Sequence, residues 1–322
     1  MLQVNDIAVV DYRSGRPVVL TGPLSFDVAE GEIFGLVGES GSGKTMCGLG
    51  LIRLAPATSR ISGSAVLRGK DLVAASEREM RRIRGADIGM IFQEPISALN
   101  PVFTLETQLI ASIRAHQKLS KREARAKAVE LMRLVGIPDP ESRLKFYPHQ
   151  LSGGLAQRAM IAMALSSGAK FLIADEPTTS LDVTIQEQII QLIERLARES
   201  GISVLFISHD LGVVARLCRR VAVLYAGEIV EIGTTEQLLR DPQHPYTKGL
   251  LRCAPDFDEV GSVRRGIPGT PPIAGQLTVG CRFRERCTFA IELCATPQVL
   301  AERAPGHSVR CCRSEALRGQ AA

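Results

Sequence analysis

The chain has 322 residues, of which 45% are hydrophobic, and its 39 basic and 34 acidic side chains give a net charge of +5. This apolar share supports a substantial core and excludes a largely disordered chain. The charge excess is mild and contains no long basic run, so we expect no nucleic-acid partner. The apolar runs fall short of the roughly 18 residues that a membrane-spanning helix needs, and Asp6 and Asp11 interrupt any signal-peptide pattern. We therefore expect a chain that neither crosses a membrane nor is exported by the usual route.

Residues 1 to about 94 predict a β-rich lobe, and its central motif is a phosphate-binding loop. The apolar run Ile33–Val37 leads directly into a segment that fits G-x-x-x-x-G-K-[ST], the Walker A pattern. Backbone N–H groups of such a loop turn inward around phosphates, and the following helix adds the positive end of its dipole. We expect Lys44 to reach the β- and γ-phosphates and the Thr45 hydroxyl to ligate magnesium. The expected nucleotide-binding residues of the loop are Gly38, Glu39, Ser40, Gly41, Ser42, Gly43, Lys44 and Thr45.

Residues from about 95 to 160 predict a helical segment. Ser120 and Glu123 have the spacing of a capping box, and apolar residues recur behind them at helical intervals. Further along, Ser152-Gly153-Gly154 precedes an apolar, helix-like run, so its backbone amides form a second anion site at a helix N-terminus. A plain helix cap is the alternative interpretation of this turn.

Buried strands are predicted again after the helical segment. The run Phe171–Ala174 is apolar throughout, and Asp175 and Glu176 emerge at its carboxyl end. We expect Asp175 to be the magnesium-side carboxylate, acting through a water, and Glu176 to be the general base that activates the attacking water. An isolated acidic pair would instead be a solvated turn. The runs 221–225 and 229–232 predict a hairpin.

The composition changes at residue 241, where Pro and Gly become frequent, and most cysteines follow this break. Cys47, Cys218 and Cys253 are scattered and are interpreted as small buried hydrophobes. The others form a C-terminal cluster of Cys281, Cys287, Cys294, Cys311 and Cys312. In a cytosolic protein a cluster favours metal over disulfides, although the spacing fits neither zinc C-x-x-C pairs nor the bacterial ferredoxin pattern. The residues alone allow a four-thiolate metal site and leave its metal open.

The order and spacing of these motifs, together with the stretch Leu151-Ser152-Gly153-Gly154-Leu155-Ala156-Gln157, resemble the ATP-binding cassette (ABC) ATPases. The resemblance implies an α/β P-loop NTPase (RecA-like) core with an ABC β-subdomain and a helical subdomain, plus a C-terminal cysteine-containing extension. Gln93 and His209 each follow a strand-like run and match the family's Q-loop and H-loop residues. By that likeness Gln93 senses magnesium and the lytic water, and His209 holds this water and the γ-phosphate. Tyr12 stands about where the adenine-stacking aromatic is found, with half-buried packing as the alternative.

Dimerisation is part of the catalytic cycle in the family that this sequence resembles. There the Ser-Gly-Gly turn of one subunit closes on the nucleotide held by the Walker A loop of another. The segment Thr179–Asp182 resembles the D-loop that crosses the same interface. The residues expected to contact the partner's ATP are Ser152, Gly153, Gly154, Gln157 and Asp182. Leu155 replaces a commonly polar residue and Thr45 a commoner Ser, but neither change removes a functional group that the site needs.

The C-terminal segment resembles the tail of the oligopeptide/dipeptide importer ATPases. The motifs that carry this resemblance are Gln243-His244-Pro245-Tyr246-Thr247, Gly280-Cys281-Arg282-Phe283, Arg286-Cys287, Cys294 and His307-Ser308-Val309-Arg310-Cys311. It implies a four-iron, four-sulfur cluster whose expected ligands are Cys281, Cys287, Cys294 and Cys311. Cys312 is the less favoured fourth ligand, and zinc or free thiols are the alternatives to the cluster.

The two resemblances together imply a domain division and a transport function. A nucleotide-binding domain is expected over residues 1–240, with its helical subdomain at about 95–160, and the extension over residues 241–322. The chain would hydrolyse ATP to energise import of di- and oligopeptides, as a peripheral subunit on the cytoplasmic side of the inner membrane. The expected partners are a second ABC ATPase subunit, related or identical, two membrane permease subunits and an extracytoplasmic solute-binding protein.

One other kind of importer and two other functional classes compete with peptide import. A nickel or glycoside importer would use the same ATPase, because this subunit does not touch the cargo. A cassette ATPase acting on DNA would need a long coiled-coil or zinc-bearing insertion between Gln93 and Leu151, and the interval here is too short. One acting on ribosomes would carry two cassettes, and this sequence holds one.

Overall fold

The computed structural model describes residues 1–179, 181–253, 266–275, 277, 279–317 and 319. The chain divides into two compact units, which are described separately. The first comprises residues 1–29, 33–74 and 206–322, and the second comprises residues 30–32 and 75–205. Strand β8 (Ser203–Ser208) contributes its first half to the second unit and its second half to the first.

The first unit contains an antiparallel sheet in the order β2-β1-β4-β5. Its strands are β1 (Leu2–Asp11), β2 (Val18–Val28), β4 (Ser59–Leu67) and β5 (Lys70–Asp71). In β2 the alternate residues Leu24, Phe26 and Val28 are buried, as expected for a strand with one face on the core. Val4 of β1 opposes Phe26 on one side and Ala65 on the other, so the register gathers these apolar side chains on one face.

A second group of strands in the first unit runs in the order β11-β12-β10-β9-β3. The fully buried β3 (Ile33–Val37) pairs in parallel with β9 (Arg220–Tyr225). Strand β9 pairs antiparallel with β10 (Glu228–Thr234), which confirms the predicted hairpin. Strands β12 (His307–Val309) and β11 (Ala301–Ala304) continue the sheet beyond β10. The C-terminal segment therefore shares a sheet with the strands that precede the composition break.

The helices of the first unit are short. They are α1 (Lys44–Leu51), α9 (Leu211–Leu217), α10 (Thr235–Arg240), α11 (Pro245–Cys253) and the 3-10 turns η2 (Arg284–Arg286) and η3 (Glu292–Ala295). Three aromatic rings join the C-terminal segment to β9. The ring of Tyr225 lies 4.6 Å from that of Tyr246 and 5.2 Å from that of Phe283, centroid to centroid. This cluster fixes α11 and η2 against the end of β9.

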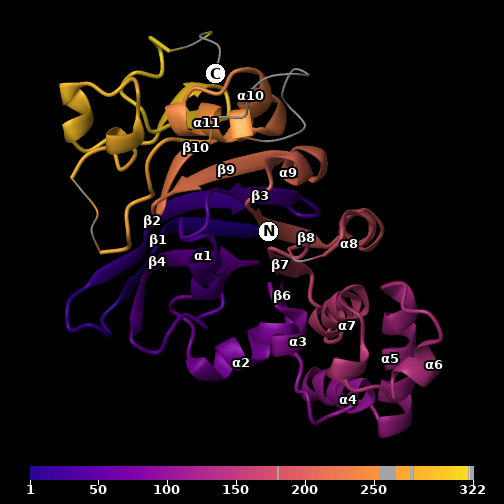
Figure 1. Ribbon diagram of the computed structural model, residues 1–322. Coiled ribbons are helices and arrows are strands. Elements are labelled where there is room, and N and C mark those ends of the chain that lie inside the picture. The colour runs from indigo at the N-terminus through magenta and orange to yellow at the C-terminus, as the bar shows by residue number, and fades with distance from the viewer. Residues whose placement is uncertain (180, 254–265, 276, 278, 318, 320–322) are drawn as a thin grey trace. The chain divides into compact units, whose positions relative to one another are not determined.

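The second unit combines two parallel strands with most of the chain's longer helices. Strand β6 (Ile88–Ile91) pairs with the fully buried β7 (Phe171–Asp175). The helices are α2 (Glu77–Ala86), α3 (Pro95–Ala98), α4 (Leu105–His116), α5 (Lys121–Leu134), α6 (Pro140–Arg143), η1 (Pro148–Gln150), α7 (Gly153–Leu165) and α8 (Val183–Ser200). Helices α4, α5 and α7 pack together, and Figure 1 shows α6 beside them. The helical segment expected from the sequence is thus present.

Helix α5 begins where the capping box predicts. The Ser120 hydroxyl accepts a hydrogen bond from the Glu123 N–H, and the Glu123 carboxylate accepts one from the Ser120 N–H. Ala124, Ala128 and Met132 are buried along one stripe. The hydrogen bonds that cap the helix hold the pKa of the Glu123 carboxyl below its ordinary value.

The scattered cysteines divide into two buried side chains and one exposed one. Cys47 and Cys218 are buried, as predicted. Cys253 is exposed, so its interpretation as a buried hydrophobe is wrong. It is the last residue of α11, where Leu251 is turned into the core instead. Separately, in the described ranges no helix is both long and apolar enough to cross a membrane.

Candidate ATP-binding site

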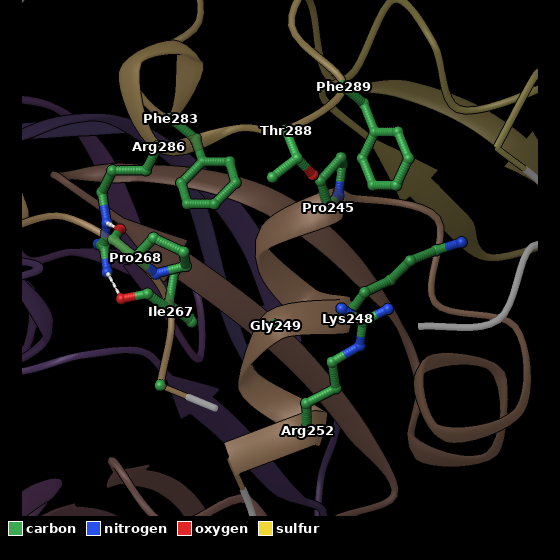
Figure 2. A pocket seen from close by; sticks show the side chains of 11 residues that line it. Pro245, Lys248, Gly249, Arg252, Ile267, Pro268, Phe283, Arg286, Thr288 and Phe289 are labelled. Atoms are coloured by element: carbon green, nitrogen blue, oxygen red, sulfur yellow. Dashed lines mark hydrogen bonds between the residues drawn. The ribbon is translucent and has the colours of Figure 1, made fainter. Parts of the chain in front are cut away.

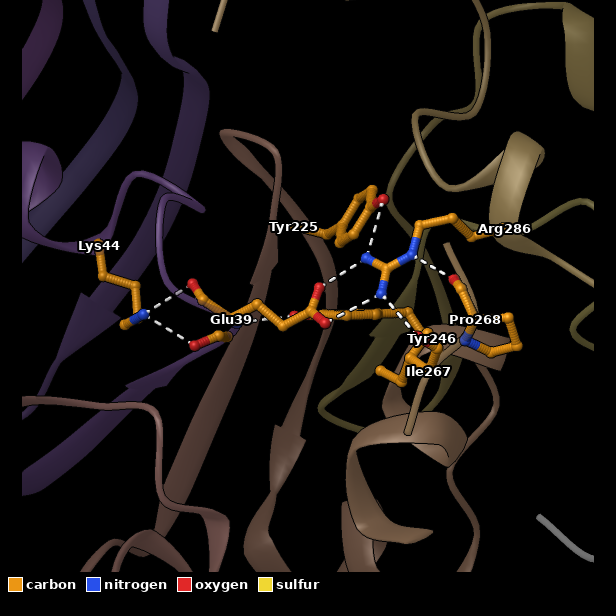
Figure 3. A network of polar contacts seen from close by, with 8 residues as sticks. Glu39, Lys44, Tyr225, Tyr246, Ile267, Pro268 and Arg286 are labelled. Carbon is orange, nitrogen blue, oxygen red and sulfur yellow. Dashed lines mark hydrogen bonds and ion pairs between the residues drawn. The ribbon is translucent and has the colours of Figure 1, made fainter. Parts of the chain in front are cut away.

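The phosphate-binding loop lies between β3 and α1 in the first unit. Gly43 is the N-cap of α1 and has φ of 100°, and a Cβ there would lie 2.8 Å from the Leu20 carbonyl oxygen. The loop thus requires glycine at this position for both conformation and space. The buried Lys44 ammonium donates to the carbonyl oxygens of Gly38 at 2.7 Å and Glu39 at 3.0 Å (Figure 3). The ammonium is therefore held against the loop's own backbone, where a phosphate can bind.

His209 also lies in the first unit, at the carboxyl end of β8 and just before α9. It is exposed. The next residue, Asp210, caps α9 by accepting hydrogen bonds from the Gly212 and Val213 N–H groups at 2.8 and 3.2 Å. The cap fixes the backbone that carries the imidazole, which leaves the side chain exposed at the end of a buried strand.

In the second unit the acidic pair closes β7 and meets the Q-loop residue. Asp175 is buried, whereas Glu176 is half-buried and has φ of 46°, an uncommon conformation for Glu. The Gln93 amide Nε2 donates to Glu176 Oε2 at 3.2 Å. The Thr179 hydroxyl donates to the same oxygen at 3.0 Å. The structure thereby brings the predicted residues Gln93 and Glu176 into contact. It also shows that Thr179, which the sequence suggested only as part of the D-loop, contacts the same carboxylate.

The signature turn occupies the start of α7. Ser152 is the N-cap residue, yet in the described part of the chain its hydroxyl makes no capping hydrogen bond. This does not support the interpretation of the turn as a plain helix cap. A Cβ on Gly154 would lie 2.7 Å from Ile185 Cγ2, so the turn packs closely against the start of α8. Asp182 caps α8 through the Ile185 N–H at 3.0 Å. A Cβ on Gly153 would lie 3.5 Å from Leu181 Cδ2, so the signature turn lies beside the D-loop. Ser180 of the D-loop lies outside the described residues.

Gln157 differs from the other signature residues, because its side chain is buried on the inward face of α7. Its Nε2 has no hydrogen-bond partner among the described residues. Contact with a partner's nucleotide therefore requires this side chain to leave the position that it has here.

Tyr12 follows β1 and is 40% exposed. The Arg60 guanidinium lies 5.0 Å from its ring centroid. The Tyr12 ring is therefore already in cation–π contact with Arg60. Its adenine-stacking role stays a prediction.

The five clustered thiols lie in the C-terminal part of the first unit. Cys294 Sγ and Cys312 Sγ are 3.6 Å apart, so the less favoured ligand lies beside a favoured one. Burial, with the neighbouring thiols adding to it, raises the pKa values of Cys281 and Cys311 to about 11. Within the described ranges, no group of three or more His, Cys, Asp or Glu side chains has the arrangement of a metal site. The donors have the soft chemistry that iron and zinc prefer, but their positions here do not form a complete site.

A cavity of about 240 Å³ opens between α11 and the segment that carries Phe283 and Phe289 (Figure 2). Pro245 and Phe283, which belong to the C-terminal motifs, line this cavity together with Arg286, whereas none of the residues expected to bind ATP does.

A Walker A loop at the start of α1, an acidic pair closing β7 and a Ser-Gly-Gly turn at the start of α7 define an ATPase of the ATP-binding cassette class. Comparison with known proteins gives the family. The family described as "ABC transporter" matches residues 21–179, and "Oligopeptide/dipeptide transporter, C-terminal region" matches residues 230–294. The chain belongs to the family of ATP-binding subunits of peptide and dipeptide ABC transporters.

Two relatives and one solved structure illustrate this membership. The "Probable peptide ABC transporter ATP-binding protein" y4tR of Sinorhizobium fredii is 46% identical over 98% of this chain and 95% of its own. The "Dipeptide transport ATP-binding protein DppD" of Bacillus subtilis is 47% identical over 91% of this chain and 88% of its own. The dimeric ATP-binding cassette MJ0796, bound to ADP and Pi, superimposes with a TM-score of 0.66 and 26% identity, covering 73% of this chain and 99% of that one.

Proposed function

We propose that this chain is the ATP-hydrolysing subunit that energises import of di- and oligopeptides through an ABC transporter complex. The observation that carries the proposal is the presence, in one chain, of the cassette and of the C-terminal region of peptide transporters. Relatives named for peptide and dipeptide transport align over nearly the whole chain, the C-terminal region included. A nickel or glycoside importer remains the alternative, because the ATPase subunit does not contact the cargo.

The roles that we propose follow from the chemistry of the side chains. Lys44 and the loop amides hold the phosphates of ATP, and Tyr12 stacks on the adenine. Thr45, Asp175 and Gln93 would hold a magnesium ion, which would neutralise charge on the phosphates. Glu176 takes the proton of the attacking water, and its bonds to Gln93 and Thr179 fix the carboxylate for this step. His209 orients the γ-phosphate.

Closure of a dimer completes the proposed site. Ser152, Gly153 and Gly154 present helix N-terminal amides to the ATP held by the partner's Walker A loop, with Gln157 and Asp182 at the same interface. The dimeric cassette bound to ADP and Pi supports this arrangement by likeness. The partner is a related ATPase or a second copy of this chain. We place the complex at the inner membrane, with this subunit on the cytoplasmic side, two permease subunits and an extracytoplasmic binding protein.

We also propose that Cys281, Cys287, Cys294 and Cys311 hold a four-iron, four-sulfur cluster, with zinc as the alternative metal. The support is the gathering of soft thiol donors in one partly buried region. Loading would deprotonate the thiols and draw them together. Iron and acid-labile sulfide assays on anaerobically purified protein test this proposal. Protein that is folded, active and free of metal contradicts it.

The transport proposal is tested by uptake in cells that carry Glu176→Gln and lack redundant importers. Labelled di- and oligopeptides, nickel and a panel of sugars are offered in parallel, with Glu130→Gln as the control. Glu130 is exposed and lies on α5, away from the predicted motifs. Selective loss of peptide uptake supports the proposal. Loss of nickel or sugar uptake instead would assign the transporter to that cargo. Intact uptake of every cargo contradicts a transport role.

A further inference from the structure

Glu39, the second residue of the phosphate-binding loop, is held at all three of its polar groups. Its carboxylate accepts two hydrogen bonds from the Arg286 guanidinium, at 2.6 and 3.0 Å. Its backbone N–H donates to the Tyr246 hydroxyl at 2.8 Å, and its carbonyl oxygen accepts from the Lys44 ammonium at 3.0 Å. Figure 3 shows these contacts in a row from Lys44 through Glu39 to Arg286. The C-terminal segment thus supplies two of the three anchors.

Arg286 is itself fixed by its surroundings. Its side chain is 4% exposed, and it donates to the carbonyl oxygens of Pro268 at 2.8 Å and Ile267 at 3.3 Å. It also donates to the Tyr225 hydroxyl at 3.3 Å. A buried guanidinium with this many acceptors holds one geometry, and its planar fork matches the carboxylate bidentately. The position of Glu39 is therefore set by residues more than 200 positions away in sequence.

The chain of contacts ends at the ammonium that the proposed function assigns to the phosphates. Two of the bonds that hold Lys44 Nζ end on carbonyl oxygens of the loop, and one of these oxygens belongs to Glu39. If Glu39 is released from the C-terminal segment, the carbonyl that guides Lys44 keeps only the contacts within the loop, such as the 3.2 Å hydrogen bond from the Ser42 N–H. Small displacements of a charged group relative to its ligand have large effects on binding and rate.

We propose that Arg286 and Tyr246 are positioning residues for the phosphate-binding loop, so that the C-terminal segment sets the loop's affinity for the phosphates of ATP. The proposal rests on the proposed function of the loop as an ATP site. It gives this segment a role in nucleotide binding that is separate from the chemistry of its thiols. Arg286 and Tyr246 act through Glu39.

The test uses the full-length chain assembled with its partner subunits. Equilibrium binding of a fluorescent ATP analogue, together with KM and kcat for MgATP, is compared among Arg286→Met, Glu39→Gln and the double variant. Each single change is expected to weaken nucleotide binding and raise KM about tenfold, with a smaller change in kcat. Because both substitutions remove the same contact, the double variant is expected to bind ATP no more weakly than either single variant. Arg286→Lys keeps the positive charge but loses the bidentate geometry of the guanidinium, so its ATP affinity is expected to lie between those of wild type and Arg286→Met.

Two further variants separate positioning from a general loss of structure. Arg303→Met removes an ion pair with Glu315 elsewhere in the C-terminal segment and is expected to leave ATP affinity unchanged. Tyr246→Phe removes only the hydroxyl that holds the Glu39 N–H, and is measured if Arg286→Met fails to fold. Additive effects in the double variant, or unchanged ATP affinity in folded Arg286→Met or Tyr246→Phe, overturn the proposal. Failure of the wild-type protein to bind or hydrolyse ATP would instead overturn the proposed function.

Discussion

Gln93 and Glu176 are 83 positions apart in sequence, yet the Gln93 amide donates a 3.2 Å hydrogen bond to the Glu176 carboxylate. The contact ties the segment after β6 to the end of β7, because the two strands are parallel neighbours and their carboxyl ends meet at one edge. A nucleotide-dependent movement of either segment must therefore change the surroundings of the proposed catalytic base.

Replacing Glu176 by Gln should separate nucleotide binding from hydrolysis. The amide keeps the size of the side chain but cannot take a proton, so ATP should still bind while kcat falls about 100- to 10,000-fold. The ATP-bound dimer should then accumulate, which size-exclusion chromatography with and without ATP would detect. Near-normal turnover would disprove the assignment of the base, whereas Lys44→Ala should weaken ATP binding itself.

Thr179→Val removes a hydroxyl that donates to the Glu176 carboxylate, while preserving the shape of the side chain. The carboxylate then keeps the Gln93 bond but loses its second anchor, and we expect kcat to fall roughly tenfold with little change in KM. Thr179→Ser retains the hydroxyl and serves as the matched control. Equal rates for the Val and Ser variants would show that this bond does not position the base.

Gly154→Ala tests the close packing of the signature turn on α8. The added Cβ would lie 2.7 Å from Ile185 Cγ2, so the turn must shift, and we expect at least a tenfold loss of ATPase rate. Adding Ile185→Ala deletes the opposing methyl group and should restore part of the rate. The measurement is the steady-state rate of ATP hydrolysis by the single and double variants. If Ile185→Ala restores none of the rate, the clash does not cause the loss of activity in Gly154→Ala.

His244 should make folding stability depend on pH. Burial lowers the pKa of this imidazole from 6.5 to about 4. Between pH 6.5 and pH 4 the imidazole is protonated in the unfolded chain but neutral in the folded one. The contribution of His244 to the free energy of unfolding is therefore fully present above pH 6.5 and is lost as the pH falls toward 4. Between pH 7 and pH 5 this group should account for about 2 kcal/mol of the lost unfolding free energy.

The comparison is between wild type and His244→Asn in urea unfolding at the two pH values. Asn can still accept the hydrogen bond that the Tyr246 N–H gives to Nδ1, but it does not titrate. Between pH 7 and pH 5, His244→Asn should lose about 2 kcal/mol less unfolding free energy than wild type does. His149→Asn alters an exposed residue and should lose as much as wild type. Parallel pH profiles for all three proteins would contradict the expected role of His244.

The sequence by itself determined the class of the protein and its local structure. The Walker A pattern, the acidic pair after Phe171–Ala174 and the Ser120–Glu123 capping box are short-range signals. The residues that carry them are neighbours along the chain, so the structure follows from local sterics, helix capping and burial. The capping box and the hairpin of β9 and β10 accordingly form where they were expected.

Only the tertiary structure decided which distant side chains meet. The Thr179 bond to Glu176, the burial of Gln157 and the exposure of Cys253 depend on which face of each element is turned inward. The Arg286 contact with Glu39 spans 247 positions, and although each residue lies in a motif, neither motif predicts that the two side chains meet. A bidentate ion pair of this kind is specified by the packing of β9, α11 and η2, and packing is a property of the folded chain rather than of any local pattern.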